Sequence, residues 1–196
     1  MEILLPLSLF ALVSSVSPGP NNLMLMSSGA TFGMRRTIPH MLGVSLGFTF
    51  MVLLVGIGIT ALFDRYPLSY TILQWFSVLY LSYLAVRIAR SAAPDASGKE
   101  NAKPLTFLQA ASFQWVNPKA WSMALTAISL YAPEKDVLSV LLVAVVFGAV
   151  NFPSITLWAT IGHKLQGILS DPNRLRLFNF TMAGLLIAFL YPILMN

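Results

Sequence analysis

Six apolar stretches, each long enough to cross a bilayer as a helix, account for most of this chain. A membrane-spanning helix needs about 20 predominantly apolar residues, because the hydrocarbon core of a bilayer is about 30 Å thick. The hydropathy pattern therefore predicts an all-α integral membrane protein with six transmembrane helices. These helices are expected near residues 2–28, 38–62, 69–89, 106–131, 137–161 and 177–195.

Composition narrows the class of protein further. Of the 196 residues, 57% are hydrophobic and 10% are charged, whereas a typical soluble domain has roughly 45–50% apolar and about 25% charged residues. We therefore expect residues 1–196 to form a single membrane domain in contact with the lipid bilayer. The net charge of +5 is explained by basic residues in short loops, so no nucleic-acid partner is expected. The absence of cysteine excludes disulfides and thiolate metal sites.

The distribution of lysine and arginine over the loops predicts the orientation. Nine of these residues fall in the loops after the first, third and fifth stretches, and two fall in the loops on the other side. Since basic loop residues favour the cytoplasm, both termini are predicted to be periplasmic. The N-terminus lacks the positively charged start of a signal peptide, so the first stretch is expected to be retained.

The first apolar stretch is interrupted by the sequence VSPGPNN at residues 16–22. Pro18 and Pro20 lack a backbone N–H, and in a helix their rings would crowd the carbonyls four residues earlier. A break at membrane depth leaves backbone groups unpaired, which is tolerated only inside the protein or beside water. The break also creates a new helix N-terminus near residues 19–22, whose free N–H groups suit an anion such as a carboxylate.

The fourth stretch carries a similar interruption one hundred positions later. Residues 116–120, VNPKA, match residues 16–20, VSPGP, at the valine and at the first proline. Three spans per half place the two halves in opposite orientations, so the pattern predicts two inverted repeats with broken first and fourth helices. Repeat one is expected over residues 1–90 and repeat two over residues 106–196, joined by a cytoplasmic loop at residues 91–105.

Lys119 lies near the middle of the fourth stretch. A lysine at the centre of a membrane helix costs about 2.5–3.5 kcal/mol on insertion scales, so it should face the bundle interior or water. The alternative is that its long side chain extends to the membrane interface. A third polar interruption, NFP at residues 151–153, lies in the fifth stretch. The three interruptions together predict a polar cavity inside the bundle.

Two pairs of glycines spaced four residues apart indicate close helix packing. Gly29 and Gly33 lie near the end of the first stretch, and Gly43 and Gly47 lie in the second. Such pairs let two helix backbones approach each other within one chain or across a homodimer. We expect packing within the monomer, and a homodimer is the alternative.

The residues around both interruptions resemble those of the LysE/RhtB-type amino-acid exporters of bacteria. The resemblance rests on SPGPNN at residues 17–22, GMRR at 33–36, GVSLG at 43–47 and FQWVNPKA at 113–120, and it covers nearly the whole chain. KPLTF at residues 103–107 is most similar to the cysteine/O-acetylserine exporter branch. The resemblance implies six helices in the bacterial inner membrane and proton-driven export of small neutral or basic amino acids, such as cysteine/O-acetylserine or homoserine/threonine.

We expect a zwitterionic amino acid to bind where the broken helices meet. Its carboxylate would lie at the helix N-terminus after Pro20 and beside Lys119, and carbonyls left free at Ser14, Val16 and Gln114 would bind its ammonium. Asparagines near the breaks could cap the helix ends, bind the ligand or do both. The candidate substrate-binding residues are Pro18, Gly19, Pro20, Asn21, Asn22, Gln114, Asn117, Pro118, Lys119 and Asn151.

Proton coupling has two candidate residues, His40 and His163. Both lie near the cytoplasmic ends of their apolar stretches, where a histidine is usually an interfacial residue. Because histidine titrates near neutral pH, both are also candidate members of a proton relay.

Three other functions are weighed against export of an amino acid. A divalent-cation exporter would need Asp, Glu, His or Cys side chains converging inside the membrane, and the predicted span interiors lack them. A membrane enzyme is not favoured, because the chain has no HExxH or GxSxG motif and no buried carboxylate pair. We therefore expect no catalytic residue, cofactor or bound metal. A membrane scaffold without transport is the remaining alternative.

Overall fold

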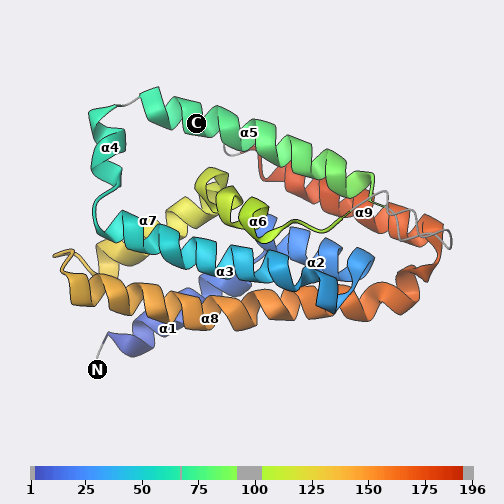
Figure 1. Cartoon of the computed structure of the whole chain (residues 1–196), viewed down its shortest axis with the longest axis horizontal. Helices are drawn as coiled ribbons and strands as arrows, with labels where there is room; N and C mark the ends of the chain where they lie inside the picture. Colours follow the sequence, from blue (N-terminus) through green and yellow to red (C-terminus); the bar gives the residue numbers. More distant parts are fainter. Residues whose placement is uncertain (1–2, 67, 92–102, 192–196) are drawn as a thin grey trace.

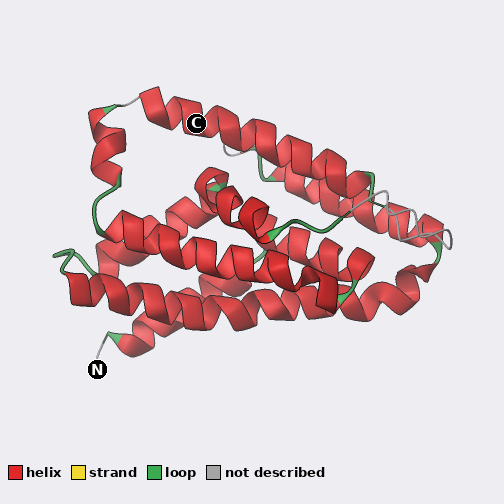
Figure 2. Ribbon diagram, in the orientation of Figure 1, coloured by secondary structure: helices red, strands yellow, loops and turns green. Residues whose placement is uncertain are grey.

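The protein is helical throughout the residues that its computed structural model describes, which are 3–66, 68–91 and 103–191. These parts of the chain contain helices joined by short loops, and no strands (Figure 2). The all-α prediction is therefore confirmed for them, whereas most of the polar loop expected at residues 91–105 lies outside the described residues. The α-helices are α1 (Leu4–Val16), α2 (Pro20–Phe32), α3 (Met34–Gly56), α4 (Thr60–Arg65), α5 (Leu68–Ala89), α6 (Phe107–Phe113), α7 (Pro118–Tyr131), α8 (Val137–Lys164) and α9 (Pro172–Ala188), with 3₁₀ turns η1 (Gln114–Val116) and η2 (Leu165–Ser170).

The helices lie along one long axis, except for the short α4 (Figure 1). Within the described residues, three helices have the length and apolar composition needed to cross a membrane: α3, α5, and α8 together with η2. The first apolar stretch consists instead of α1 followed by α2, and the fourth consists of α6, η1 and α7. Both stretches are thus broken near their middles, as the prolines predict.

The third expected interruption is not a break. Helix α8 runs without a gap from Val137 to Lys164, with Pro153 inside it. A proline removes one N–H donor from a helix, but α8 packs against α1, α2 and α3. We infer that this packing keeps the helix continuous where the local sequence alone favours an interruption.

The outer surface is rich in apolar side chains, and the interior contains polar residues beside its apolar core. Large apolar side chains such as Leu5, Leu79 and Leu138 are exposed on the outer faces of their helices. Polar residues, including six serines and four asparagines, are buried between the helices. Because extensive exposed apolar surface is rare in soluble monomers, this arrangement fits a lipid environment.

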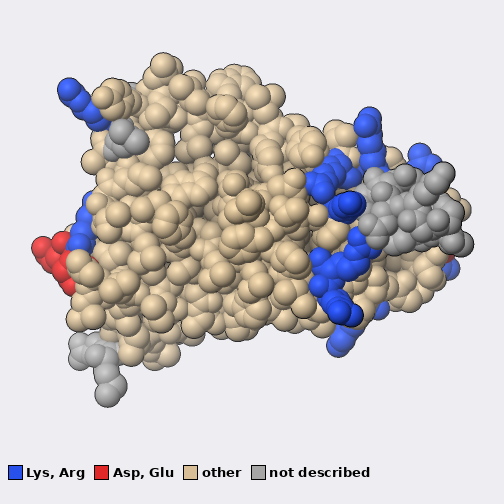
Figure 3. Space-filling model, viewed as in Figure 1, with Lys and Arg blue, Asp and Glu red and all other residues tan. Residues whose placement is uncertain are grey.

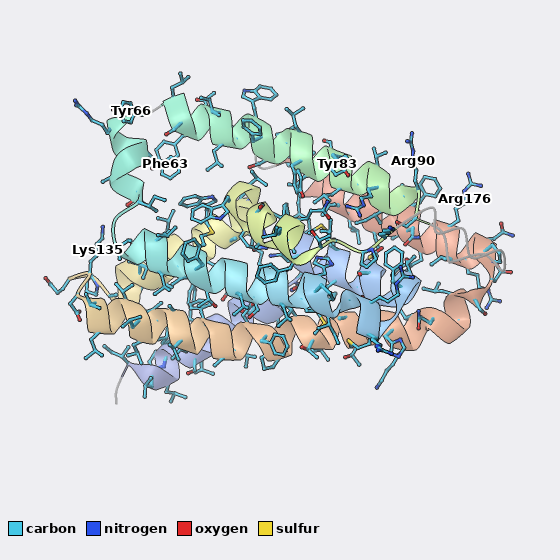
Figure 4. All side chains as sticks on the ribbon, in the orientation of Figure 1. Phe63, Tyr66, Tyr83, Arg90, Lys135 and Arg176 are labelled. Carbon is cyan, nitrogen blue, oxygen red and sulfur yellow. The ribbon has the colours of Figure 1, made fainter. Side chains whose placement is uncertain are left out.

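Charged residues separate along the long axis. Figure 3 shows lysines and arginines gathered at the end where α2, α5 and α8 end and α3 and α9 begin, which we call the basic end. Arg90 and Arg176 lie there, whereas Lys135 lies at the opposite end (Figure 4). The asymmetry of basic loop residues in the sequence is thus an asymmetry between the two ends of the folded bundle.

Glycines allow two close helix crossings within the chain. A Cβ on Gly43 or Gly47 would collide with backbone atoms of α6, and a Cβ on Gly29 would collide with a backbone carbonyl of α8. These three glycines therefore pack within the monomer, as expected. Gly33 differs, because its φ of 79° lies in the left-handed region and lets the chain turn from α2 into α3.

Candidate functional site

Lys119 joins the two helix breaks. Its Nζ donates hydrogen bonds to the Ser17 carbonyl at 2.6 Å, to the Ser17 hydroxyl at 2.9 Å and to the Pro18 carbonyl at 3.2 Å. The lysine of the fourth stretch therefore reaches the break of the first stretch. The ammonium lies on oxygen atoms that the break has released from helical hydrogen bonding.

A second bridge joins the breaks through two side-chain amides. Asn21 Nδ2 donates to Gln114 Oε1 at 2.8 Å, and Gln114 Nε2 donates back to Asn21 Oδ1 at 3.2 Å. Gln114 is fully buried and also donates to the Ala110 carbonyl at 2.8 Å. This reciprocal pair fixes the register of α2 against η1 without using any charged group.

The N-terminus of α2 has no side-chain cap. Gly19 is the N-cap residue in an extended conformation, and Pro20 is the first helical residue. Pro20 has no N–H, so the first free backbone donors of α2 belong to Asn21 and Asn22. Such N–H groups and the helix dipole favour an anion at this position.

Asparagines cap both breaks, in different ways. Asn117 is the N-cap of α7, and its Oδ1 accepts from the Lys119 backbone N–H at 3.2 Å. Asn22 Nδ2 reaches backwards and donates to the carbonyls of Ser15 at 2.8 Å and Ser17 at 2.9 Å. The capping role considered from the sequence is therefore confirmed for both asparagines, and it leaves a second role open.

The carbonyls expected to be free for a ligand at Ser14, Val16 and Gln114 are already bonded inside the protein, so that expectation is wrong. A buried carbonyl without a partner is costly, and the fold supplies a donor to each. The Ser17 hydroxyl donates to the Ser14 carbonyl at 2.9 Å, and the Trp158 indole N–H donates to the Val16 carbonyl at 3.0 Å. The Asn117 backbone N–H donates to the Gln114 carbonyl at 3.3 Å.

A hollow of about 330 Å³, which we call the break chamber, lies beside the two breaks. This volume includes the space at its open mouth. Of the ten candidate residues, six line the chamber, while Pro18, Pro20, Gln114 and Pro118 form the breaks next to it. The lining residues are Ser14, Ser15, Gly19, Asn21, Asn22, Phe48, Asn117, Lys119, Ala120, Met123, Asn151 and Ile155.

Asn151 presents an unused hydrogen-bond acceptor at the chamber wall. Its Nδ2 donates to the Ser15 hydroxyl at 3.3 Å, but its buried Oδ1 has no hydrogen-bond partner among the described residues. Leaving a buried polar group unpaired costs about 1–3 kcal/mol. A ligand that donates a hydrogen bond, such as an ammonium, would remove this penalty.

Several contributors to the site were not found from the sequence. Ser15 and Ser17 supply oxygens, Trp158 supplies a donor, and Phe48 and Met123 form an apolar wall. The indole N–H of Trp158 in an apolar stretch was a usable signal, because a buried tryptophan usually finds an acceptor. The serines carried no comparable signal, since serines are common in this chain.

The two histidines occupy different surroundings. His40 is only 1% exposed, and neither of its ring nitrogens has a hydrogen-bond partner among the described residues. His40 is therefore buried between helices and is not exposed on the surface of the bundle. His163 is exposed, and its Nδ1 lies 2.7 Å from the Gln166 side-chain oxygen. Neither histidine lines the break chamber.

A search of the described residues for metal sites finds no group of three or more His, Cys, Asp or Glu side chains that could hold an ion. The break chamber instead offers one ammonium, two free helix N–H groups, amide oxygens and an apolar wall. That set of groups suits a small molecule with both an anionic and a cationic end.

Comparison with known proteins finds one family that matches most of the chain. Residues 12–195 match the family described as LysE type translocator. The chain is 32% identical over 182 residues to the cysteine/O-acetylserine efflux proteins of Escherichia coli strain K12 and of Shigella sonnei, covering 91% of this chain and 90% of each relative. It is 31% identical to the protein of the same description in Escherichia coli O1:K1, with the same coverage. No solved structure shows significant similarity to it.

Proposed function

This chain belongs to the LysE type translocator family, and on that premise we propose that it exports small amino acids, with cysteine and O-acetylserine as the first candidates and homoserine or threonine next. The observation that carries the proposal is the break chamber, where Lys119 bonds the two broken helices beside an unpaired amide oxygen of Asn151. The printed function of the relatives supports the substrate class.

The ammonium of Lys119 occupies the position that a substrate ammonium would take. It lies on the oxygens of Ser17 and Pro18, which are the oxygens that the first break provides. In the proposal, the substrate's ammonium displaces Lys119 from these atoms and also donates to Asn151 Oδ1. Lys119 then turns to the substrate's carboxylate, which lies at the free N–H groups of Asn21 and Asn22. In this exchange every charged group keeps hydrogen-bond partners, because the substrate's carboxylate meets Lys119 and its ammonium takes over the oxygens that Lys119 leaves.

The transport cycle that we propose uses six spans in two inverted repeats around this chamber. The break in the first stretch and the break in the fourth stretch support this arrangement, because both contribute to one site. Rocking of one half against the other would open the chamber to each side in turn. The gathering of basic residues at one end supports a cytoplasmic basic end and periplasmic termini in the inner membrane (Figure 3).

The test is uptake and counterflow of radiolabelled L-cysteine, O-acetyl-L-serine, L-homoserine and L-threonine in vesicles that contain the purified protein. The wild type should exchange at least one of them, and Lys119→Ala should exchange it about a hundredfold more slowly, because a buried cation that pairs with substrate is lost. Lys135→Ala is the matched control, since Lys135 lies at the exposed loop between α7 and α8.

Three outcomes would contradict the proposal. Exchange by Lys119→Ala at the wild-type rate would remove Lys119 from the mechanism. Transport of Mn²⁺ without any amino acid in the same vesicles would favour the divalent-cation exporter. Vesicles that exchange nothing, although the protein is folded and inserted, would favour a scaffold.

We also propose that the proton gradient drives export, with His40 and His163 as the candidate relay. Histidine exchanges protons near neutral pH, and His40 is buried between helices near the basic end. A double His40→Gln, His163→Gln protein should lose the stimulation of efflux by an imposed pH gradient while it keeps counterflow. Full stimulation in that variant would exclude both histidines.

A further inference from the structure

A second hollow lies nearer the basic end, and we call it the His40 chamber. It has a volume of about 340 Å³ including its mouth, close to that of the break chamber. Its walls come from α2, α3, α5 and the segment that precedes α6. The lining residues are Met24, Ser27, Ser28, Phe32, His40, Leu84, Ile88, Ser91, Lys103 and Leu105.

The His40 ring is a buried polar group of this chamber that the described residues leave unused. The serine hydroxyls of the wall are paired: Ser27 donates to Asn179 Oδ1 at 3.2 Å, Ser28 lies 2.9 Å from the Thr37 hydroxyl, and Ser91 donates to the Arg87 carbonyl at 2.9 Å. His40 is buried to the same degree, yet both ring nitrogens lack a partner among the described residues. A neutral imidazole carries one donor and one acceptor. Neither the donor nor the acceptor of the ring is used by the described residues.

Two cationic residues belong to this part of the molecule. Lys103 lines the chamber, and Arg87 precedes the lining residue Ile88 on α5. Arg87 Nη2 also donates to the Lys103 carbonyl at 2.7 Å, which holds the segment before α6 against α5. Among the described residues that line the chamber there is no acidic side chain. The positive charges of Lys103 and Arg87 favour the anionic end of a ligand.

The rest of the wall is apolar. Met24, Phe32, Leu84, Ile88 and Leu105 surround the polar groups. A binding pocket with mostly apolar walls and a few polar groups fits a small molecule with one charged end and a short side chain. Inorganic phosphate or sulfate would leave these apolar walls unused, whereas a small amino acid would use both parts.

Helix α2 connects this chamber to the break chamber. Asn22 lines the break chamber and Ser27 lines the His40 chamber, and five residues of helix separate them by about 8 Å. A buried apolar cluster reaches one chamber through Ile155 and the other through Met24 and Leu84. The two chambers therefore share the packing of one apolar cluster.

We propose that the His40 chamber is a second amino-acid site, where the substrate waits before it reaches the break chamber. This inference rests on the proposed export function, and it places the waiting site on the side from which an exported substrate arrives. The substrate's carboxylate accepts from the His40 ring and is attracted by Lys103 and Arg87. Its side chain lies against the apolar walls.

The test counts bound ligand at equilibrium, with no pH gradient present, so that proton coupling does not enter the result. Radiolabelled L-cysteine, kept reduced, and O-acetyl-L-serine are dialysed against the purified full-length protein. We expect two molecules per chain in the wild type and one in Lys119→Ala. We expect one in His40→Leu as well, because the affinity of the His40 chamber for the ligand should fall about tenfold or more.

Two further variants separate a binding role of His40 from a structural one. His40→Gln keeps one donor group and one acceptor and should restore the second molecule with reduced affinity. Ile88→Trp keeps His40 but fills the chamber, and it should also abolish the second molecule. Ser77→Ala is the control, because Ser77 is buried in α5 and lines neither chamber.

The outcomes distinguish this inference from the export function. One molecule per chain in the wild type that is lost in Lys119→Ala and kept in His40→Leu would overturn the second site and leave the export function standing. Loss of the second molecule in His40→Leu but not in Ile88→Trp would also overturn the site. A wild type that neither binds nor exchanges any amino acid would overturn both proposals.

Discussion

The two helix breaks have similar sequences but satisfy their backbones in different ways. At the second break, the short turn η1 carries the chain out of α6, and the adjacent Asn117 caps α7. At the first break, the oxygens at the end of α1 accept from side chains of other helices. These side chains are Asn22 of α2, Lys119 of α7 and Trp158 of α8.

This difference identifies the break that is able to respond to a ligand. A break that is capped by its own neighbour in sequence keeps its hydrogen bonds when other helices move. A break that depends on side chains from other helices must exchange partners whenever those helices shift or a ligand arrives. We therefore expect the first break to change during transport and the second to remain as it is.

The largest difference should appear between Asn22→Ala and Asn117→Ala. Asn22 is buried and bonds two carbonyls, so its loss should reduce the free energy of unfolding by about 2–4 kcal/mol. Asn117 caps one N–H, and its loss should cost about 0.5–2 kcal/mol. Equilibrium unfolding in mixed detergent micelles measures both. Equal losses would remove the contrast between the breaks.

The next test uses two tryptophans that each donate one bond to a break. Trp158→Phe removes the donor to the Val16 carbonyl, and Trp121→Phe removes the donor to the Trp115 carbonyl. Each should lower the free energy of unfolding by about 1–3 kcal/mol, because a carbonyl loses its partner. Vesicle counterflow should slow in Trp158→Phe and stay near wild type in Trp121→Phe. The reverse pattern would assign the responsive role to the second break.

Gly19→Ala tests the position of Lys119 with little effect on stability. The new Cβ would lie 2.6 Å from Lys119 Cδ and 3.0 Å from Nζ, so the lysine must move. The φ of −178° at Gly19 suits any residue, and the change in unfolding free energy should stay below about 0.5 kcal/mol. Counterflow should fall about tenfold, as expected for loss of one charge-assisted hydrogen bond. Gly184→Ala is the control, because its Cβ would meet open space. Unchanged counterflow in Gly19→Ala would show that Lys119 need not hold this position.

Pro153→Ala should have the smallest effect on transport. Pro153 lies inside the continuous helix α8, so alanine restores an N–H and does not remove a break. Counterflow should remain within about twofold of the wild type, an activation difference below about 0.5 kcal/mol. A large loss would mean that α8 uses its proline as a hinge, and α8 would then join the first break as a moving part.

The breaks were predictable because they depend on local chemistry. Pro18 and Pro20 remove two N–H donors wherever they occur in a helix, and the structure ends α1 at Val16 and begins α2 at Pro20. The same reasoning failed at Pro153, since packing on neighbouring helices holds α8 together there. Proline thus predicts a missing hydrogen bond reliably, but the surrounding helices decide whether the helix ends.

The candidate site was partly predictable for the same reason. Lys119 and the asparagines were identifiable because charged and amide groups in an apolar stretch require partners. The groups that donate to the carbonyls of the breaks, and the burial of His40, were not predictable, because both depend on which side chains of distant helices reach a given atom. Trp158 lies 142 positions from the carbonyl that it satisfies.

The sequence by itself determined the helical class, the positions of the two breaks and the end of the bundle that carries the basic residues. Each of these follows from short-range rules for apolar length, proline and loop charge. Only the tertiary structure decided that Lys119 bonds Ser17, that Asn21 pairs with Gln114, and that His40 lines a second chamber. A buried polar group must find a partner, and which partner it finds is set by the packing of helices that are far apart in the chain.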